Sequence, residues 1–252
     1  MRLTDRITAE GHRLFQLRSL MPLVLLPALY FALLQMAQFE QRWGKQVENR
    51  WLVFCVCVSA LGLLTRSLTV GFVPAGTSGR GQGTPSASTL NTLGMYSIVR
   101  SPLYLANGVM WLGVALATTS GWFVVVSVLV YWLYIERVIA AEEAFLETQF
   151  GDAFRSWAQS TPCFLPRPSL WRAPAMTFSL RTVLRREHSG LIAVGVVFTL
   201  IEFISNALIQ GEPPARWLVT DRAWVIFFVV TVLSGMSLQM MKKGHWLDAA
   251  GR

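Results

Sequence analysis

Long runs of apolar residues, broken by short polar segments, dominate the pattern along the chain. Six runs stand out, and their approximate cores are residues 21–36, 51–64, 103–117, 122–135, 191–208 and 223–238. A helix that crosses a membrane needs about 20 mostly apolar residues, so the shorter runs must borrow flanking residues, tilt little or lie inside the bundle. The pattern therefore predicts an all-α protein, a polytopic bundle of about six transmembrane helices.

The polar segments between the runs predict how the bundle is oriented. Residues 118–121 form a small polar turn between the third and fourth runs, which is typical of a tight helical hairpin. Arg and Lys recur in the N-terminal arm, after the second and fourth runs, and at the C-terminus. Because cytoplasmic loops are enriched in these residues, we expect both termini in the cytoplasm. Segments 40–50 and 212–222, which mix both signs, are then expected as outside loops.

Composition supports a membrane protein and argues against other classes. The 252 residues are 53% hydrophobic and 14% charged, with a net charge of +8. In a chain with long apolar runs, this positive charge is first a signal of topology, so we expect no nucleic-acid partner. Cys55 and Cys57 lie two residues apart in an apolar run and thus on different helix faces. With no clustering of cysteine and histidine, we expect no metal site.

A stretch without acidic residues is the first candidate for chemistry. Residues 49–135 contain no Asp or Glu, but they include Arg66, Arg80 and Arg100. Arg100 stands just ahead of Pro102, which suits the first turn of a helix, and a helix N-terminus beside an arginine favours an anion. The alternative is that these arginines only anchor the bundle to lipid head groups. The glycine-rich segment within 73–101 is either a mobile lid or a plain linker.

The second candidate is an acidic stretch after the fourth run. Glu136, Ala140 and Glu143 share one helix face, and small residues beside them leave room for a ligand. Carboxylates opposite an arginine-rich loop suit a cationic or hydroxyl-bearing cofactor. The alternative is a solvated helix face with local ion pairs.

Two spaced motifs include these candidates. The first motif consists of Gly94, Tyr96, Arg100, Ser101, Pro102 and Tyr104. The second consists of Glu142, Glu143, Leu146, Phe150, Gly151, Phe154 and Trp157, followed by Pro162, Phe164 and Pro166. Together they resemble the isoprenylcysteine carboxyl methyltransferase and phospholipid methyltransferase superfamily of membrane enzymes. The resemblance covers roughly residues 74–168.

This resemblance implies an S-adenosylmethionine-dependent methyltransferase whose cofactor is enclosed at the cytoplasmic interface. The cofactor-binding residues would be Tyr96, Arg100, Ser101, Pro102, Tyr104, Glu142 and Glu143. Arg137 would face the acceptor, while Arg80 and Arg100 would position its oxyanion. Ser101 departs from the family, which has histidine there, and serine replaces only part of that contact. This departure has two interpretations: the serine weakens cofactor binding, or it marks an inactive paralogue.

Arginines favour a carboxylate or phosphate acceptor over the amine of an ethanolamine lipid. The resemblance extends to a bacterial branch that methylates the lipid A 1-phosphate, which implies an inner-membrane enzyme with a cytoplasmic active site. A phosphate monoester is largely ionised at neutral pH, so methyl transfer by in-line displacement needs no general base. Alternatives are ethanolamine N-methylation, a membrane oxidoreductase, and a non-catalytic scaffold or small transporter. A scaffold or transporter predicts inward-facing charges along several helices, which the sequence does not indicate.

The expected organisation has six parts. A cytoplasmic amphipathic segment (1–20) precedes two transmembrane helices (21–73) and the catalytic core with its helical hairpin (74–168). A cytoplasmic connector (169–190), two further transmembrane helices (191–240) and a cytoplasmic tail (241–252) follow. Glu202 and Asn206, four residues apart in an apolar run, are expected to face protein or a water-filled cleft. We favour a structural polar contact for this pair.

Overall fold

The computed structural model describes residues 3–17, 20–74 and 87–249, which contain helices and no strand. This confirms the predicted all-α class. The helices are α1 (Leu3–Gln16), η1 (Met21–Leu25), α2 (Leu26–Trp43), α3 (Lys45–Gly71), α4 (Met95–Ile98), α5 (Pro102–Ala117), α6 (Gly121–Phe150), α7 (Asp152–Ser160), η2 (Pro168–Leu170), α8 (Leu180–Phe203), η3 (Ile204–Ile209), α9 (Pro214–Thr220) and α10 (Arg222–Lys243).

Five helical segments within the described residues are long and apolar enough to cross a membrane: Met21–Trp43, Lys45–Gly71, Gly121–Phe150, Leu180–Ile209 and Arg222–Lys243. Large apolar side chains on their outer faces are exposed, as a lipid-facing surface requires. The third predicted span is instead the 16-residue helix α5. It rises about 24 Å, less than the roughly 30 Å hydrocarbon core of a bilayer. The structure thus has five helices of spanning length and one shorter apolar helix.

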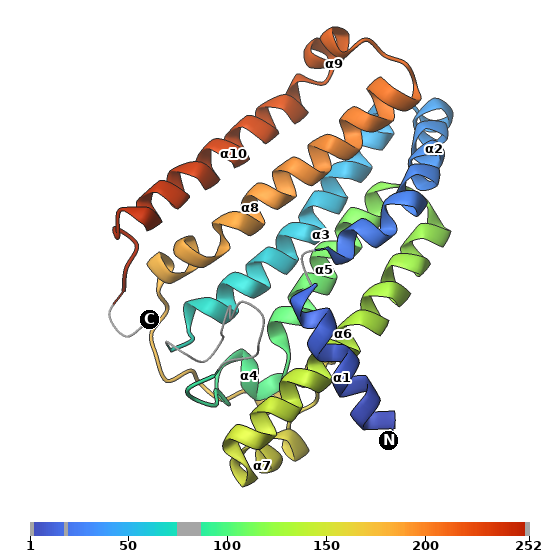
Figure 1. Cartoon of the computed structure of the whole chain (residues 1–252). Helices are drawn as coiled ribbons and strands as arrows, with labels where there is room; N and C mark the ends of the chain where they lie inside the picture. Colours follow the sequence, from blue (N-terminus) through green and yellow to red (C-terminus); the bar gives the residue numbers. More distant parts are fainter. Residues whose placement is uncertain (1–2, 18–19, 75–86, 250–252) are drawn as a thin grey trace.

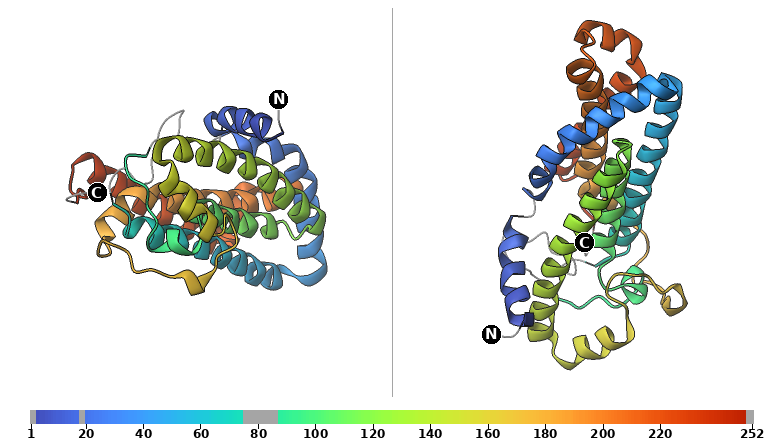
Figure 2. Two further views of the ribbon diagram at one scale, coloured as in Figure 1. Left: turned by 90° about the horizontal axis from the view of Figure 1, so that it is seen from below. Right: turned by 90° about the vertical axis from the view of Figure 1, so that its right-hand side faces the viewer.

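The long helices lie side by side in a slanted bundle (Figure 1). Helices α4 and α7 lie at one end of this bundle, and α9 lies at the opposite end. Helix α1 and the last turns of α10 lie at the same end as α4 and α7. The amphipathic helix α1 packs along the outside of α6, which the right-hand view of Figure 2 shows. At this contact, a Cβ on Gly11 would overlap the carbonyl of Arg137, so glycine permits the close approach.

Small residues bring α5 against α3. A Cβ on Gly62 would lie 2.6 Å from the carbonyl oxygen of Ala106, and a Cβ on Gly113 would overlap the hydroxyl of Ser59. The Ser59 hydroxyl donates to the carbonyl of Met110 at 2.8 Å. Close backbone approach through small residues is typical of helix packing in membranes. The short helix α5 is thereby held in the middle of the bundle, next to the longer α3.

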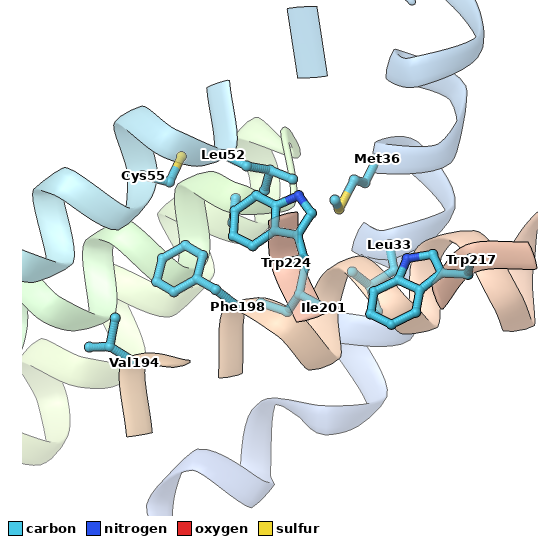
Figure 3. Close-up of a cluster of buried hydrophobic side chains, with 10 residues drawn as sticks. Leu33, Met36, Leu52, Cys55, Val194, Phe198, Ile201, Trp217 and Trp224 are labelled. Atoms are coloured by element: carbon cyan, nitrogen blue, oxygen red, sulfur yellow. The ribbon is translucent and has the colours of Figure 1, made fainter. Parts of the chain in front are cut away.

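A buried apolar cluster joins α2, α3, α8, α9 and α10 (Figure 3). Its largest side chains include Met36, Leu52 and Phe198, all fully buried. Trp217 and Trp224 complete the cluster from the last two helices. This packing fixes the C-terminal helices against α2 and α3. Cys55 belongs to the cluster, whereas Cys57 is exposed, which confirms that the two thiols lie on different faces.

A polar centre lies beside this cluster, at the turn between α2 and α3. The ammonium group of Lys45 contacts the fully buried carboxylate of Glu202 and lies 3.2 Å from that of Glu48. Asp221 and Glu40 lie 3.5 and 3.7 Å from the same nitrogen. We refer to these five residues as the Lys45 centre. The side chain of Asn206 accepts a hydrogen bond from Lys45 at 3.1 Å. Glu202 and Asn206 therefore face protein, as predicted.

The Lys45 centre corrects two predictions from the sequence. Segment 40–50 was expected as a loop, but α2 runs to Trp43 and α3 begins at Lys45. The only break is Gly44, whose φ of 82° is in the region that favours glycine. The argument against a transporter also assumed that charges do not point inward from several helices. The centre shows inward charges on α2, α3 and α8. These charges surround one lysine, so the assumption was wrong, and their contacts with Lys45 indicate a structural role.

Candidate active site

The first sequence motif lies where α4 leads into α5. Gly94 precedes α4 with a φ of 59°, and its amide donates to the carbonyl of Arg172 at 3.0 Å. The amide of Arg172 in turn donates to the hydroxyl of Ser97 at 2.9 Å. These bonds tie α4 to the chain that follows the second motif.

Segment 161–167, with the last part of the second motif, runs beside the start of α5. The amide of Arg100 donates to the carbonyl of Pro162 at 2.9 Å, and the amide of Ser101 donates to that of Cys163 at 3.2 Å. Both amides precede the helix and have no partner within it, so the neighbouring segment satisfies them. The extended segment thus fixes the N-terminal end of α5.

A sharp turn after α6 brings aromatic residues back over α4. Gly151, at a φ of 52°, ends α6 and begins α7. Phe154 on α7 is buried and packs edge-to-face with Trp157, with ring centres 5.8 Å apart. The indole nitrogen of Trp157 donates to the carbonyl of Tyr96 at 3.1 Å. The turn therefore closes α7 onto the first motif.

Arg100 and Glu143 form an ion pair between the two motifs. The guanidinium Nε of Arg100 donates to the Glu143 carboxylate at 2.8 Å, and its Nη1 donates to the carbonyl of Thr161 at 3.0 Å and to that of Ala158. The thiol of Cys163 lies 3.7 Å from the same carboxylate oxygen. Arg100 therefore holds α6, the end of α7 and the following segment against the start of α5.

These elements enclose a cavity of about 290 Å³, near the lower end of the range for small-molecule sites. Residues from both motifs line it, together with residues of α3 and α8. The lining residues are Arg66, Ala87, Thr89, Leu90, Asn91, Tyr96, Arg100, Ser101, Pro102, Leu103, Tyr104, Asn107, Tyr134, Val138, Ile139, Glu142, Glu143, Phe145, Leu146, Phe154, Trp157 and Arg186.

All seven residues predicted to bind a cofactor line this cavity: Tyr96, Arg100, Ser101, Pro102, Tyr104, Glu142 and Glu143. Arg137 does not. Its guanidinium donates to the carboxylate of Glu10 on α1 at 3.0 Å and to the carbonyl of Leu133 at 2.7 Å. Glu136 is exposed and does not line the cavity. Arg80 and the predicted lid lie outside the described residues.

The placement of Arg137 follows from helix geometry. Tyr134, Val138 and Glu142 form one stripe of α6 at four-residue spacing and line the cavity. Arg137 lies on the face that α1 covers, where Glu10 neutralises it. The structure therefore gives Arg137 a contact that joins two helices, rather than the position beside the acceptor that the resemblance implied.

Two arginines at the cavity were not among the predicted site residues. Arg66 on α3 donates to both carboxylate oxygens of Glu187, at 2.7 and 3.1 Å, and to the amide oxygen of Asn107 at 2.6 Å. Arg186 on α8 is the second. Arg66 could have been found from the sequence, because it belongs to the acid-free stretch. Arg186 belongs to a run of basic residues that the positive-inside rule explains equally well.

Two groups at or beside the cavity, both outside the spanning helices, have raised pKa values: Tyr96 lines the cavity, and Cys163 contacts the lining residue Glu143. Loss of hydration, together with the nearby carboxylate of Glu142, raises the pKa of Tyr96 above its ordinary value. Burial, followed by the charge of Glu143, raises the pKa of the Cys163 thiol. Both groups are therefore neutral at physiological pH, and they offer a hydroxyl and a thiol rather than charged nucleophiles.

Ser101 is buried at the N-terminus of α5 and lines the cavity. It is the N-cap residue, but its side chain makes no capping hydrogen bond. The start of α5 therefore does not depend on a capping side chain at this position. Because serine is smaller than the histidine that the family of the two motifs has here, it leaves the cavity wider.

The lining combines three kinds of group. Tyr96, Phe154 and Trp157 supply aromatic surface, Glu142 and Glu143 supply carboxylates, and arginines from α3, α5 and α8 supply positive charge. Such a set suits a ligand that has a flat ring, hydrogen-bond donors and charges of both signs. Among the described lining residues there is no histidine or lysine.

Comparison with known proteins agrees with this geometry. Residues 52–153 match the family model described as Phospholipid methyltransferase. The match begins in α3 and ends at the start of α7, so it includes the first motif and the carboxylate pair of the second. Helix α8, which supplies Arg186 and Glu187, lies outside the matched segment.

Two curated relatives share part of this chain. One is the cobalt-zinc-cadmium resistance protein CzcN of Cupriavidus metallidurans, 40% identical over 85 residues, which are 34% of this chain and 39% of that protein. The other is the nickel-cobalt-cadmium resistance protein NccN of Alcaligenes xylosoxydans xylosoxydans, 36% identical over 134 residues, which are 53% of this chain and 60% of the relative. The chain thus spans less than two thirds of either relative.

No solved structure matches the chain. The resemblance seen in the two motifs is confirmed by the matched family model, and the lengths of the apolar helices agree with a membrane location. The chain is therefore an integral membrane protein, and its residues 52–153 match the phospholipid methyltransferase family, within the isoprenylcysteine carboxyl methyltransferase-like superfamily.

Proposed function

We propose that this protein transfers a methyl group from S-adenosylmethionine to an anionic, lipid-linked acceptor at the cytoplasmic face of a bacterial inner membrane. The observation that supports this most directly is the cavity that both motifs line. It brings a carboxylate pair, six aromatic rings and three arginines of the described residues together from helices that are far apart in sequence. Helices of spanning length contribute to its lining, so a lipid acceptor would reach it from the bilayer.

The residues present fit the cofactor. S-adenosylmethionine has an adenine ring, ribose hydroxyls, an ammonium group, a carboxylate and a sulfonium centre. Glu142 and Glu143 would accept hydrogen bonds from its ammonium group or hydroxyls, while Tyr96, Phe154 and Trp157 offer aromatic faces for adenine or for the positive sulfonium. When bound, the cofactor supplies an electrophilic methyl group.

The protein's own contribution would be to position the acceptor and exclude water. A phosphate monoester or a carboxylate is ionised at neutral pH and attacks without a general base. The absence of histidine and lysine from the described lining fits such an acceptor. Alignment of the two reacting groups alone is worth several kcal/mol, and up to about 7–11 kcal/mol in favourable cases. Arginines would hold the acceptor's other oxygens in place.

Two arginines are less available for this role than the sequence implied. Arg66 and Arg100 both donate to carboxylates of the protein, so they position neighbouring helices as well as lining the cavity. We favour O-methylation of an anionic acceptor. The leading choices for this acceptor are a lipid phosphate, such as the lipid A 1-phosphate, and a carboxylate. The curated relatives are named as resistance proteins against divalent metals. These names are compatible with O-methylation of a phosphate, because methylating a phosphate oxygen removes charge that attracts divalent cations.

The second candidate is N-methylation of an ethanolamine lipid. Glu142 favours it, because a carboxylate at the cavity wall can hold an ammonium group or take its proton. The family description, which refers to phospholipids, is compatible with both candidates. The acceptor assay must therefore include both chemical classes.

The first test is cofactor binding by the purified protein in detergent, measured by calorimetry. Glu142→Gln removes one cavity carboxylate, and Glu147→Gln is its matched control, because Glu147 is on the same helix, exposed, and paired with Arg155. We expect Glu142→Gln to weaken binding about tenfold or more, since hydrogen bonds to charged groups are worth about 1.5–3 kcal/mol. The control should bind like the wild type. If the wild type does not bind S-adenosylmethionine, the proposal is wrong.

The second test is methyl transfer from labelled S-adenosylmethionine. Phosphatidic acid, a prenylcysteine, lipid A and phosphatidylethanolamine are offered in separate micelles, and products are identified by the mass of an added methylene. Transfer to an oxygen of the first three supports O-methylation. Transfer only to phosphatidylethanolamine would replace it with the N-methylation candidate. Cofactor binding without transfer to any lipid would favour a scaffold that has kept its binding site.

A further inference from the structure

Helix α8 forms one wall of the cavity although it lies outside the segment that matches the family. Arg186, in the second turn of α8, lines the cavity beside residues of both motifs. Its neighbour Glu187 points to Arg66 of α3. The C-terminal part of the chain therefore contributes side chains that the family domain alone does not contain.

Contacts near the N-terminal end of α8 fix this wall. The amide of Ser179 donates to the carbonyl of Gly71 at 2.9 Å, and its hydroxyl caps the helix by accepting from the amide of Thr182 at 3.2 Å. Phe178 packs so closely on Gly71 that a Cβ there would overlap its ring. The start of α8 is therefore held against the end of α3, about two turns ahead of Arg186.

A second contact holds α8 just beyond Arg186. The carboxylate of Glu187 is buried and accepts two hydrogen bonds from Arg66, which also donates to Asn107. The bidentate ion pair joins α3 to α8, and the hydrogen bond to the amide oxygen of Asn107 joins α3 to α5. Bidentate arginine pairs restrict orientation as well as distance. Arg186 lies between these two fixed points, so its position at the cavity is set by the fold.

All three arginines of the described lining interact with the protein. Arg66 and Arg100 each donate to a protein carboxylate and to a further oxygen of the protein. Arg66 on α3 and Arg186 on α8 line the same cavity as Tyr96, and their positive charges counteract the increase of its pKa. Helices α3 and α8 therefore both supply positive charge to the cavity.

The depth of Arg186 in the membrane adds a second argument. The apolar run of α8 begins at residue 191, five residues after Arg186. Five residues of α-helix correspond to about 7.5 Å, which places the guanidinium just outside the hydrocarbon core, at the level of lipid head groups. Arginine at this level is suited to the phosphate or carboxylate of a lipid.

We propose that Arg186 is the residue that recognises the anionic head group of the acceptor, and that α8 thereby determines which class of lipid the methyltransferase domain accepts. This inference rests on the proposed function. The ligand class is a lipid with a terminal phosphate or carboxylate, held by Arg186 in the cavity that Tyr96 also lines. Arg66, fixed by Glu187, lines the same cavity.

The test separates recognition of the acceptor from binding of the cofactor. Arg186→Gln removes the charge, Arg186→Lys keeps the charge but loses the planar fork, and Arg185→Gln is the matched control. Arg185 precedes Arg186 on the same helix but pairs with Asp248 outside the cavity. Short-chain phosphatidic acid and short-chain phosphatidylethanolamine are titrated into each purified variant by calorimetry, and S-adenosylmethionine is titrated separately.

We expect the wild type to bind phosphatidic acid more tightly than phosphatidylethanolamine. Arg186→Gln should weaken binding of phosphatidic acid about tenfold or more, Arg186→Lys should weaken it less, and Arg185→Gln should not. Affinity for S-adenosylmethionine should stay unchanged in all three variants. In the transfer assay, Arg186→Gln should raise KM for an anionic acceptor more than it lowers kcat.

Three results would overturn the inference. Equal effects of Arg186→Gln and Arg185→Gln would mean that only the charge of the surface matters. Loss of affinity for S-adenosylmethionine with unchanged binding of phosphatidic acid would make Arg186 a cofactor residue. A wild type that does not prefer phosphatidic acid would also exclude the role. Failure of the proposed function is a different result: no binding of S-adenosylmethionine and no methyl transfer by the wild type, whatever lipid it binds.

Discussion

Lys45 offers a direct test of how the C-terminal helices are fastened to the rest of the bundle. Its ammonium group contacts carboxylates from α2, α3, α8 and the residue before α10. Two of these, Glu48 and Glu202, are 0% exposed. Lys45→Met preserves much of the apolar stem but leaves this group of acids without its cation.

The expected loss can be bounded from the structure. Removing one partner of a buried ion pair costs about 3–5 kcal/mol, because the other partner stays buried without compensation. The Lys45 side chain is itself 29% exposed, so we expect the lower end, about 3 kcal/mol. At about 1.4 kcal/mol for each factor of ten, this is a loss of roughly two decades in the folding equilibrium.

The assay is reversible unfolding in mixed micelles, followed by circular dichroism as the denaturing detergent is increased. Lys242→Met is the matched control, because Lys242 is exposed near the end of α10. A triple variant that combines Lys45→Met with Glu48→Gln and Glu202→Gln should regain most of the lost stability, since it also removes the buried charges. If Lys45→Met unfolds like the control, or if the triple variant is no more stable than Lys45→Met, the electrostatic explanation is wrong.

Two further predictions concern packing and pH. Gly113→Leu should destabilise the bundle by about 1–3 kcal/mol, because any side chain there must displace α3; an unchanged midpoint in the same unfolding assay would contradict the close contact. Hydrogen bonds from Arg137 and then Arg6 lower the pKa of Glu10. The resulting stabilisation of α1 is fully present above the ordinary carboxyl pKa and is lost as pH falls through the lowered one. The protection of α1 against hydrogen exchange, relative to the intrinsic exchange rate at each pH, should therefore fall at acidic pH, and Arg137→Gln should weaken this dependence.

The two motifs could be read from the sequence because each of them is local. Their glycines, prolines and aromatic residues stand at fixed spacings, and a family with the same spacings is known. All seven cofactor candidates accordingly line one cavity. What the spacing does not show is which face of α6 the amphipathic α1 covers, so Arg137 was placed beside the acceptor although it faces Glu10.

The contacts that join distant helices could not be predicted in the same way. Lys45 and Glu202 are 157 residues apart, and Arg66 and Glu187 are 121 apart. Each residue alone is compatible with a loop, a helix end or an interface with lipid head groups. Only tertiary packing decides among these, because an acidic residue in an apolar run indicates that a partner exists without indicating which one.

The short helix α5 makes the depth of the cavity dependent on the thickness of the membrane. With 16 residues, none of them exposed, α5 is enclosed by longer helices and cannot reach both surfaces of a bilayer that these helices cross. The cavity lies at the N-terminal end of this helix, where Ser101 and Pro102 line it. The depth of the cavity's arginines relative to lipid head groups is therefore set jointly by the protein and by the chain length of its lipids. A membrane of different acyl composition would change how well head groups and the cavity align, without any change in the amino-acid sequence.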